Sequence, residues 1–160
     1  MTEKTGTFVV THAEEWSAVL RDVETAQVHT LASNPGLAVG EVLEGTVTPE
    51  PPLELSWELV GVEDRRRIEL VDSDLEPTRD SVERVADAEV GEVLRVDRAG
   101  RGELHLLPVP SGEVETAATE VLADEETIAR AARLEAVRVE VRRSADDGLV
   151  SVRYLPDHGG

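Results

Sequence analysis

The chain has 160 residues, enough for one sizeable core or two small ones, and 40% of them are hydrophobic. It contains no cysteine, which excludes disulfides, a thiolate nucleophile and cysteine metal ligands. The formal net charge is −18, from 34 acidic and 16 basic residues, and Lys4 is the only lysine.

This excess of carboxylates indicates adaptation to a salt-rich cytoplasm. In dilute salt the charge would destabilise a small compact domain through self-repulsion. In molar salt the Debye length falls to about 3 Å, so the same charges are nearly screened from one another. An acidic interaction tail and a partly disordered chain are the alternatives. The acids are spread evenly and the apolar periodicity is retained, which favours a salt-adapted folded protein.

The amino terminus, MTEKTGTFVV, lacks the charged region and long apolar run of a signal peptide. No apolar stretch approaches the roughly 18 residues that a membrane span needs. We therefore expect a cytoplasmic protein with no membrane partner.

Short alternating segments separated by turn signals follow one another through residues 6–72. The expected strands are 7–11, 17–23, 27–32, 41–48 and 53–61. The last of them has the clearest period of two. Its apolar face carries Leu53, Leu55, Trp57 and Leu59. Repeated short strands of this spacing predict a small β barrel or sandwich.

Residues 73–77 read as a linker into a helical region. Thr78 is placed to cap a first helix, Ser111 a second and Asp124 a third. Each is followed by apolar residues at helical spacing, so we expect three amphipathic helices.

The chain closes with a predicted β-hairpin. Residues 136–143 and 149–155 alternate between apolar and polar side chains, and Asp147 and Gly148 supply the turn signal. With a short strand at 103–109, we expect three strands that carry helices on one face.

Five segments of the first third of the chain share a further pattern: GTFVVT, SAVLRDV, QVHTLA, LAVGEVLEGTV and LSWELVGVE. Their order resembles an OB-type or cold-shock-type barrel, and this resemblance implies nucleic-acid binding. Such folds stack bases on aromatic side chains in a positive groove. The second and third strands contain no Phe, Tyr or Trp, which leaves Trp16 and His29 as the candidates. Phosphate attraction is also screened in molar salt, so nucleic acid is a disfavoured partner.

The fold class is therefore α+β. We expect a small β-barrel domain, OB-like or similar, at residues 1–72 and a linker at 73–77. A small α+β domain with the C-terminal β-hairpin occupies 78–160.

Four segments extend over most of the chain: EPTRD at 76–80, DRAGRGELHLLPVP at 97–110, DEETIARAARL at 124–134 and VRYLP at 152–156. On these segments the chain resembles an uncharacterised haloarchaeal family known only as a domain of unknown function. The resemblance supports a salt-rich cytoplasm and implies no activity, cofactor or site residue.

Catalytic signals are sparse. The histidines His12, His29, His105 and His158 are scattered without metal-ligand spacing. The nucleophile motif GxSxG is absent. Neighbouring carboxylates are so frequent in this chain that they carry no information about acid–base chemistry. We expect no catalytic residue, no metal site and no cofactor.

The conspicuous triplet Arg65–Arg67 lies among acids, since residues 63–76 hold six acidic and three basic side chains. We expect it to pair with neighbouring carboxylates. Residues 130–155 are different, because they hold six arginines against four acids. Arg138 and Arg142 share one face of the hairpin, and Arg153 joins them if the register allows. These three are the candidate binding residues for an anionic partner, with internal pairing to acids as the alternative.

The sequence therefore favours a non-enzymatic binding or adaptor protein with a protein partner. An OB-type nucleic-acid-binding module is the second hypothesis. A small enzyme with a site between the two halves is the third. The oligomeric state is left open.

Overall fold

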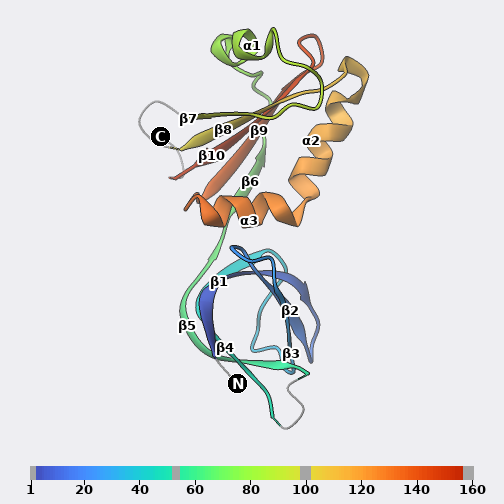
Figure 1. Ribbon diagram of the computed structural model, residues 1–160. Helices are drawn as coiled ribbons and strands as arrows, with labels where there is room; N and C mark the ends of the chain where they lie inside the picture. Colours follow the sequence, from blue (N-terminus) through green and yellow to red (C-terminus); the bar gives the residue numbers. More distant parts are fainter. Residues whose placement is uncertain (1–2, 52–54, 98–101, 157–160) are drawn as a thin grey trace. The chain divides into compact units, whose positions relative to one another are not determined.

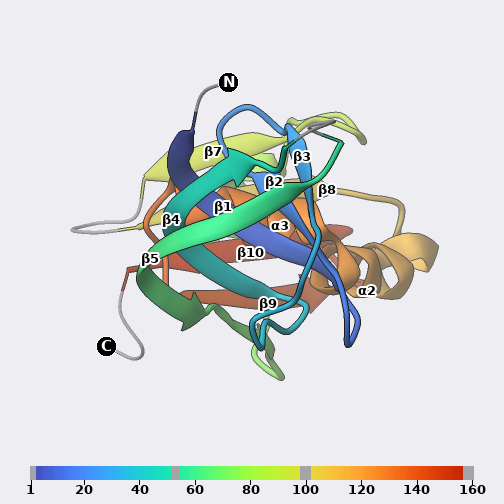
Figure 2. The same ribbon diagram turned by 90° about the horizontal axis from the view of Figure 1, so that it is seen from below.

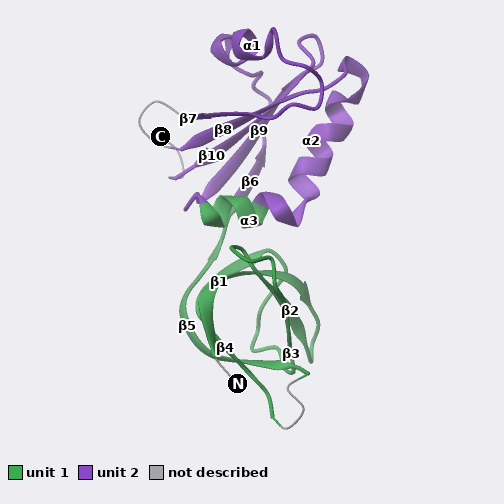
Figure 3. Ribbon diagram, viewed as in Figure 1, with its two compact units in different colours: residues 1–68, 128–133 green, residues 69–127, 134–160 purple. Residues whose placement is uncertain are grey.

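The computed structural model describes residues 3–51, 55–97 and 102–156. The chain separates into two compact units, drawn in different colours in Figure 3. Unit 1 comprises Met1–Ile68 and Ile128–Arg133, and unit 2 comprises Glu69–Thr127 and Leu134–Gly160. Each unit is described by itself.

Unit 1 is built around a closed five-stranded barrel (Figure 1). Its strands are β1 (Lys4–Ala13), β2 (Ala18–Asp22), β3 (Val28–Leu31), β4 (Glu41–Pro49) and β5 (Trp57–Arg67). They close in the order β1-β2-β3-β5-β4, with β3 and β5 parallel and every other neighbouring pair antiparallel. The predicted small barrel in the N-terminal half is confirmed.

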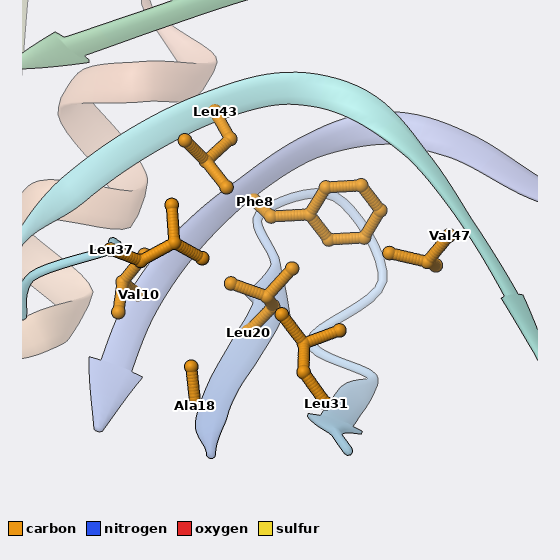
Figure 4. Close-up of a cluster of buried hydrophobic side chains, with 8 residues drawn as sticks. All are labelled: Phe8, Val10, Ala18, Leu20, Leu31, Leu37, Leu43 and Val47. Carbon is orange, nitrogen blue, oxygen red and sulfur yellow. The ribbon is translucent and has the colours of Figure 1, made fainter. Parts of the chain in front are cut away.

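The barrel interior is mainly aliphatic, because the chain has few aromatic residues. Phe8 from β1, Leu20 from β2 and Leu43 from β4 are fully buried, and Figure 4 shows their side chains converging. The cluster is completed by Val10, Ala18, Leu31, Leu37 and Val47. Removing this apolar area from water, at about 25 cal/mol per Å², is the main driving force for folding unit 1.

The strands β4 and β5 run side by side along the barrel wall (Figure 2), and their register shifts between Glu44 and Gly45. A Cβ atom on Gly45 would lie 2.3 Å from the carbonyl oxygen of Gly61, so only glycine fits there. Such an irregularity increases local twist, which a small closed barrel needs.

The strand β5 differs from the predicted strand 53–61. It begins at Trp57 and continues to Arg67, because β4 keeps pairing with it as far as Glu41 opposite Arg67. Leu55 precedes the strand and is 82% exposed, so it does not share a buried face with Trp57. Leu53 lies outside the described residues.

Unit 2 contains a five-stranded sheet rather than the three strands expected from the sequence. Its strands are β6 (Glu69–Asp72), β7 (Leu94–Asp97), β8 (Glu103–Pro108), β9 (Arg138–Ser144) and β10 (Leu149–Leu155). The order is β6-β9-β10-β8-β7, with only β6 and β9 parallel among the neighbouring pairs. The predicted C-terminal hairpin is confirmed as β9 and β10. The strand β6, which the sequence groups with the barrel, pairs with β9.

The described helices are α1 (Arg79–Val85), the 3-10 turn η1 (Ser111–Glu113), α2 (Val114–Ala123) and α3 (Glu125–Arg133). Thr78 caps α1 by accepting a hydrogen bond from the Ser81 amide at 3.2 Å. Asp124 accepts one from the Glu126 amide at 2.9 Å, as expected. Ser111 caps no helix, because the chain forms η1 before α2 begins.

The helices α1 and α2 cover opposite faces of the sheet. The prediction from the sequence, that all helices lie on one face, is therefore wrong. Val85 of α1 packs on Leu104 and Leu106 of β8. Glu115 of α2 pairs with Arg143, and Arg143 projects from the other face because side chains alternate along each strand.

Candidate functional site

Three of the five candidate binding residues gather on one face of the second sheet. Arg138 and Arg142 lie four residues apart on β9, so they project from the same side. The register places Arg153 of β10 opposite Glu140, which lies between the two arginines. The condition that the sequence left open for Arg153 is therefore met. We call Arg138, Arg142 and Arg153 the arginine cluster.

Glu140 is the centre of the arginine cluster and is 8% exposed. Arg142 donates a short hydrogen bond from Nε to Oε1 of Glu140. Nε of Arg153 lies 3.8 Å from the same oxygen, and Nη2 of Arg138 lies 3.8 Å from Oε2. Nε of Arg138 also lies 3.5 Å from Oε1 of Glu69. One carboxylate thus lies within 4 Å of three guanidinium groups and accepts a hydrogen bond from one of them.

The arginine cluster brings three positive side chains together in a chain whose net charge is negative. Three guanidinium groups meet the two carboxylates of Glu69 and Glu140, whereas the whole chain has a net charge of −18. The three arginine side chains are 14% to 23% exposed, so solvent and salt screen them less than surface charges. The charge interactions of these guanidinium groups are therefore weakened less by salt than those of exposed arginines.

Ser151 adds a polar atom to the same face. It lies two residues before Arg153 on β10 and opposite Arg142 in the register. Its Oγ is fully buried and has no hydrogen-bond partner within the described part of the chain. A buried hydroxyl without a partner costs free energy, about 1–3 kcal/mol in mutational data.

The other two candidate residues lie in unit 1 and do not meet. Trp16 lies between β1 and β2 and is 77% exposed. His29 of β3 is fully buried inside the barrel. The candidate pair Trp16 and His29 therefore forms no common surface for stacking bases.

His29 lies among aromatic rings. Its ring centroid is 4.5 Å from that of Trp57 and 5.6 Å from that of Phe8. Neither ring nitrogen has a hydrogen-bond partner among the described residues. Burial lowers the pKa of His29 below its usual 6.5; the charge of Lys4 acts in the same direction and that of Asp22 opposes it.

The arginine triplet is paired internally, as expected for Arg65 and Arg66. Arg65 donates from Nε and Nη2 to both carboxylate oxygens of Glu41, at 2.8 and 2.9 Å. Arg66 pairs with Asp64 at 2.7 Å, and Arg67 donates to a main-chain carbonyl. The hydrogen bonds from Arg65 hold the pKa of Glu41 below its ordinary value, although burial acts in the opposite direction.

One polar pair that the sequence did not single out lies in unit 2. Nε2 of His105 is 3.0 Å from Oε1 of Glu103, and the His105 ring lies 4.8 Å from that of Tyr154. A cavity of about 170 Å³ adjoins the pair, lined by Gly102, Glu103, Leu134, Ala136, Tyr154 and Pro156. The sequence offers no signal for the cavity, because Leu134 and Tyr154 lie far from Glu103 in the chain.

The described residues contain no cluster of three metal-ligating side chains, and none of their helices is long and apolar enough to cross a membrane. His158 lies outside the described residues.

The fold defines a two-unit α+β protein with an N-terminal closed barrel and an arginine-bearing sheet in the second unit. The chain belongs to a family of unknown function, DUF5812, whose model matches residues 4–143. No curated protein and no solved structure matches it.

Proposed function

We propose that this protein is a non-enzymatic binding protein that engages an acidic segment of a partner protein through the arginine cluster. The observation that carries the proposal is the convergence of Arg138, Arg142 and Arg153 around the buried carboxylate of Glu140. Arginine is suited to this task, because its planar fork matches carboxylate geometry and is always charged.

A carboxylate is the ligand that these arginines already hold. Glu140 accepts from Arg142, and it keeps the other two guanidinium groups within 3.8 Å. A partner carboxylate would compete with Glu140 for these guanidinium groups, so its affinity depends on displacing this internal pairing. Their partial burial keeps the attraction effective in salt that would screen an exposed pair.

The test is the affinity of the full chain for a fluorescein-labelled oligoglutamate peptide in molar KCl, measured by anisotropy. Replacing Arg138→Gln and Arg142→Gln together should weaken binding at least about tenfold, since charged hydrogen bonds of roughly 1.5–3 kcal/mol are lost. The matched control is Arg66→Gln with Arg67→Gln, which changes the net charge equally and should alter affinity less than about twofold. Circular dichroism verifies that each variant is folded. Equal losses in both double variants would contradict the proposal, because binding would then follow net charge alone.

We further propose that the protein works in a salt-rich cytoplasm. The support is compositional: acids outnumber bases by 34 to 16, and 15 of the basic residues are arginine. Carboxylates at this density repel one another in dilute salt and are screened at molar salt.

A nucleic-acid-binding module of OB type is the second candidate, because OB folds are five-stranded barrels that bind oligonucleotides on the face of their second and third strands. In this barrel the outward positions of β2 and β3 carry Val19, Arg21, Val28 and Thr30, which supply no aromatic platform. Titration of labelled single-stranded RNA and DNA in molar KCl separates the candidates. Saturable binding that survives the Arg138 and Arg142 replacements would favour the barrel.

A further inference from the structure

We propose that the cavity beside Glu103 is a binding site for a small ligand with a primary ammonium group. The cavity has a volume of about 170 Å³ and lies wholly within unit 2. It adjoins the start of β8 and the end of β10. An apolar cavity of about 150 Å³ in another protein takes up benzene, so this one has room for a molecule of similar size.

The wall of the cavity combines polar and apolar surface. Leu134, Ala136 and Pro156 contribute aliphatic surface, and Tyr154 contributes an aromatic ring. Among the residues that the structure describes, Glu103 is the one charged side chain that lines the cavity. A ligand with a small apolar body and a single positive group matches both kinds of surface.

His105 positions the carboxylate of Glu103. It is 4% exposed, and its Nε2 lies 3.0 Å from Oε1 of Glu103, where an N–H on that nitrogen donates to the carboxylate. The other carboxylate oxygen, Oε2, has no hydrogen-bond partner within the described ranges. Oε2 of Glu103 can thus accept a hydrogen bond from a ligand, while the hydrogen bond between His105 and Oε1 fixes the orientation of the carboxylate.

A fixed carboxylate next to an aromatic ring selects a cation. An ammonium group forms a charge-assisted hydrogen bond with the carboxylate and is attracted to an aromatic ring. A neutral ligand of the same shape leaves the carboxylate partly desolvated and unpaired, and an anionic ligand is repelled. The site is independent of the arginine cluster. Glu103 and Tyr154 project from one face of the sheet, and Arg153 projects from the other face.

The experiment is calorimetric titration of the full chain with benzylamine, benzyl alcohol and benzoate in the same KCl buffer. Benzylamine should bind saturably, benzyl alcohol at least about tenfold more weakly because it lacks the charged hydrogen bond, and benzoate not at all. Glu103→Gln should weaken benzylamine binding at least about tenfold. Glu92→Gln, an exposed residue outside the cavity, should leave it unchanged.

Amide chemical shifts of the wild-type chain provide a second readout that needs no variant. Benzylamine should shift the resonances of Glu103, Leu134 and Ala136. Absence of benzylamine binding, equal affinity for benzyl alcohol, or shifts confined to other residues would each overturn the proposal. The oligoglutamate result is unaffected by any of these outcomes, because that peptide tests a different face.

Discussion

His29 and Glu140 both have buried ionisable side chains, but their surroundings differ. Glu140 lies within 4 Å of three guanidinium groups. His29 lies between the rings of Phe8 and Trp57 with no described hydrogen-bond partner, so its neutral form is favoured. The barrel core therefore contains a group that resists protonation.

We predict that His29 makes unit 1 less stable in mild acid. Its pKa in the folded chain lies below 6.5, so between that lowered value and 6.5 the unfolded chain binds more protons than the folded chain. The contribution of neutral His29 to the free energy of unfolding is fully present above about pH 6.5. As the pH falls through this window, that contribution decreases by up to about 1.4 kcal/mol per pH unit. Denaturant unfolding from pH 8 to 5 should show this slope, and His29→Leu should remove it. An unchanged slope in the variant would assign the effect to other groups.

Glu41 gives the opposite pH dependence. Because Arg65 holds its pKa below the ordinary 4.5, the stabilising contribution of Glu41 is present above about pH 4.5 and is lost as pH falls below it. Glu41→Gln should be less stable than the wild type at pH 7, and the difference should shrink toward pH 3. Glu44→Gln is the control, since Glu44 is about half exposed and should change stability little. Identical unfolding midpoints for Glu41→Gln and the wild type at pH 7 would contradict this role of Glu41.

Among the elements, the irregular pairing of β4 and β5 is the most constrained. Gly45 lies against the carbonyl oxygen of Gly61 at a distance that excludes a Cβ atom. The reverse is not true, because a Cβ atom on Gly61 would meet no atom within 4 Å. The two glycines therefore provide a matched pair for substitution.

We predict that Gly45→Ala destabilises the barrel by about 1–3 kcal/mol, the usual cost of forcing extra volume into a filled site. Gly61→Ala should change stability by less than about 0.5 kcal/mol, the range of surface substitutions. Urea unfolding of both variants measures the difference. Equal effects would show that the close approach of the two strands does not constrain the barrel.

The elements that were predictable are those defined by local pattern. The hairpin of β9 and β10 follows from alternation and from Asp147-Gly148, and the cap at Thr78 follows from its position before an apolar spacing. The parallel contact of β3 and β5 that closes the barrel is a long-range pairing, which local periodicity does not encode. The strands β6 and β7 have four residues each, too few to show a period.

The candidate site was also predictable only where it depends on local sequence pattern. Arg138 and Arg142 share a face by simple alternation, so their neighbourhood follows from the sequence. The role of Glu140 as the shared centre depends on the register that brings Arg153 beside it. The cavity at Glu103 depends on tertiary contacts alone, since Tyr154 and Leu134 lie far from Glu103 in the chain.

At the scale of the whole molecule, the net charge of −18 leads to a prediction about salt. We predict that lowering KCl from molar to about 0.1 M destabilises the protein, because the Debye length grows from about 3 to about 10 Å and carboxylates begin to repel. Thermal unfolding followed by circular dichroism across this range measures the effect, with an uncharged osmolyte as the control for water activity. A melting temperature that is constant with salt would contradict the proposed adaptation.

This acidic molecule gathers three arginines around one buried glutamate. The most direct test of this account is the oligoglutamate affinity of Glu140→Gln in molar KCl. Removing the internal carboxylate while keeping every arginine should strengthen binding at least about fivefold, the equivalent of roughly 1 kcal/mol for one unit charge about 4 Å away. Glu120→Gln, which removes the same charge from an exposed helical position, should leave the affinity within about twofold of the wild type. Affinity that is unchanged in Glu140→Gln, or raised equally in Glu120→Gln, would contradict the assignment of the arginine cluster as the binding site.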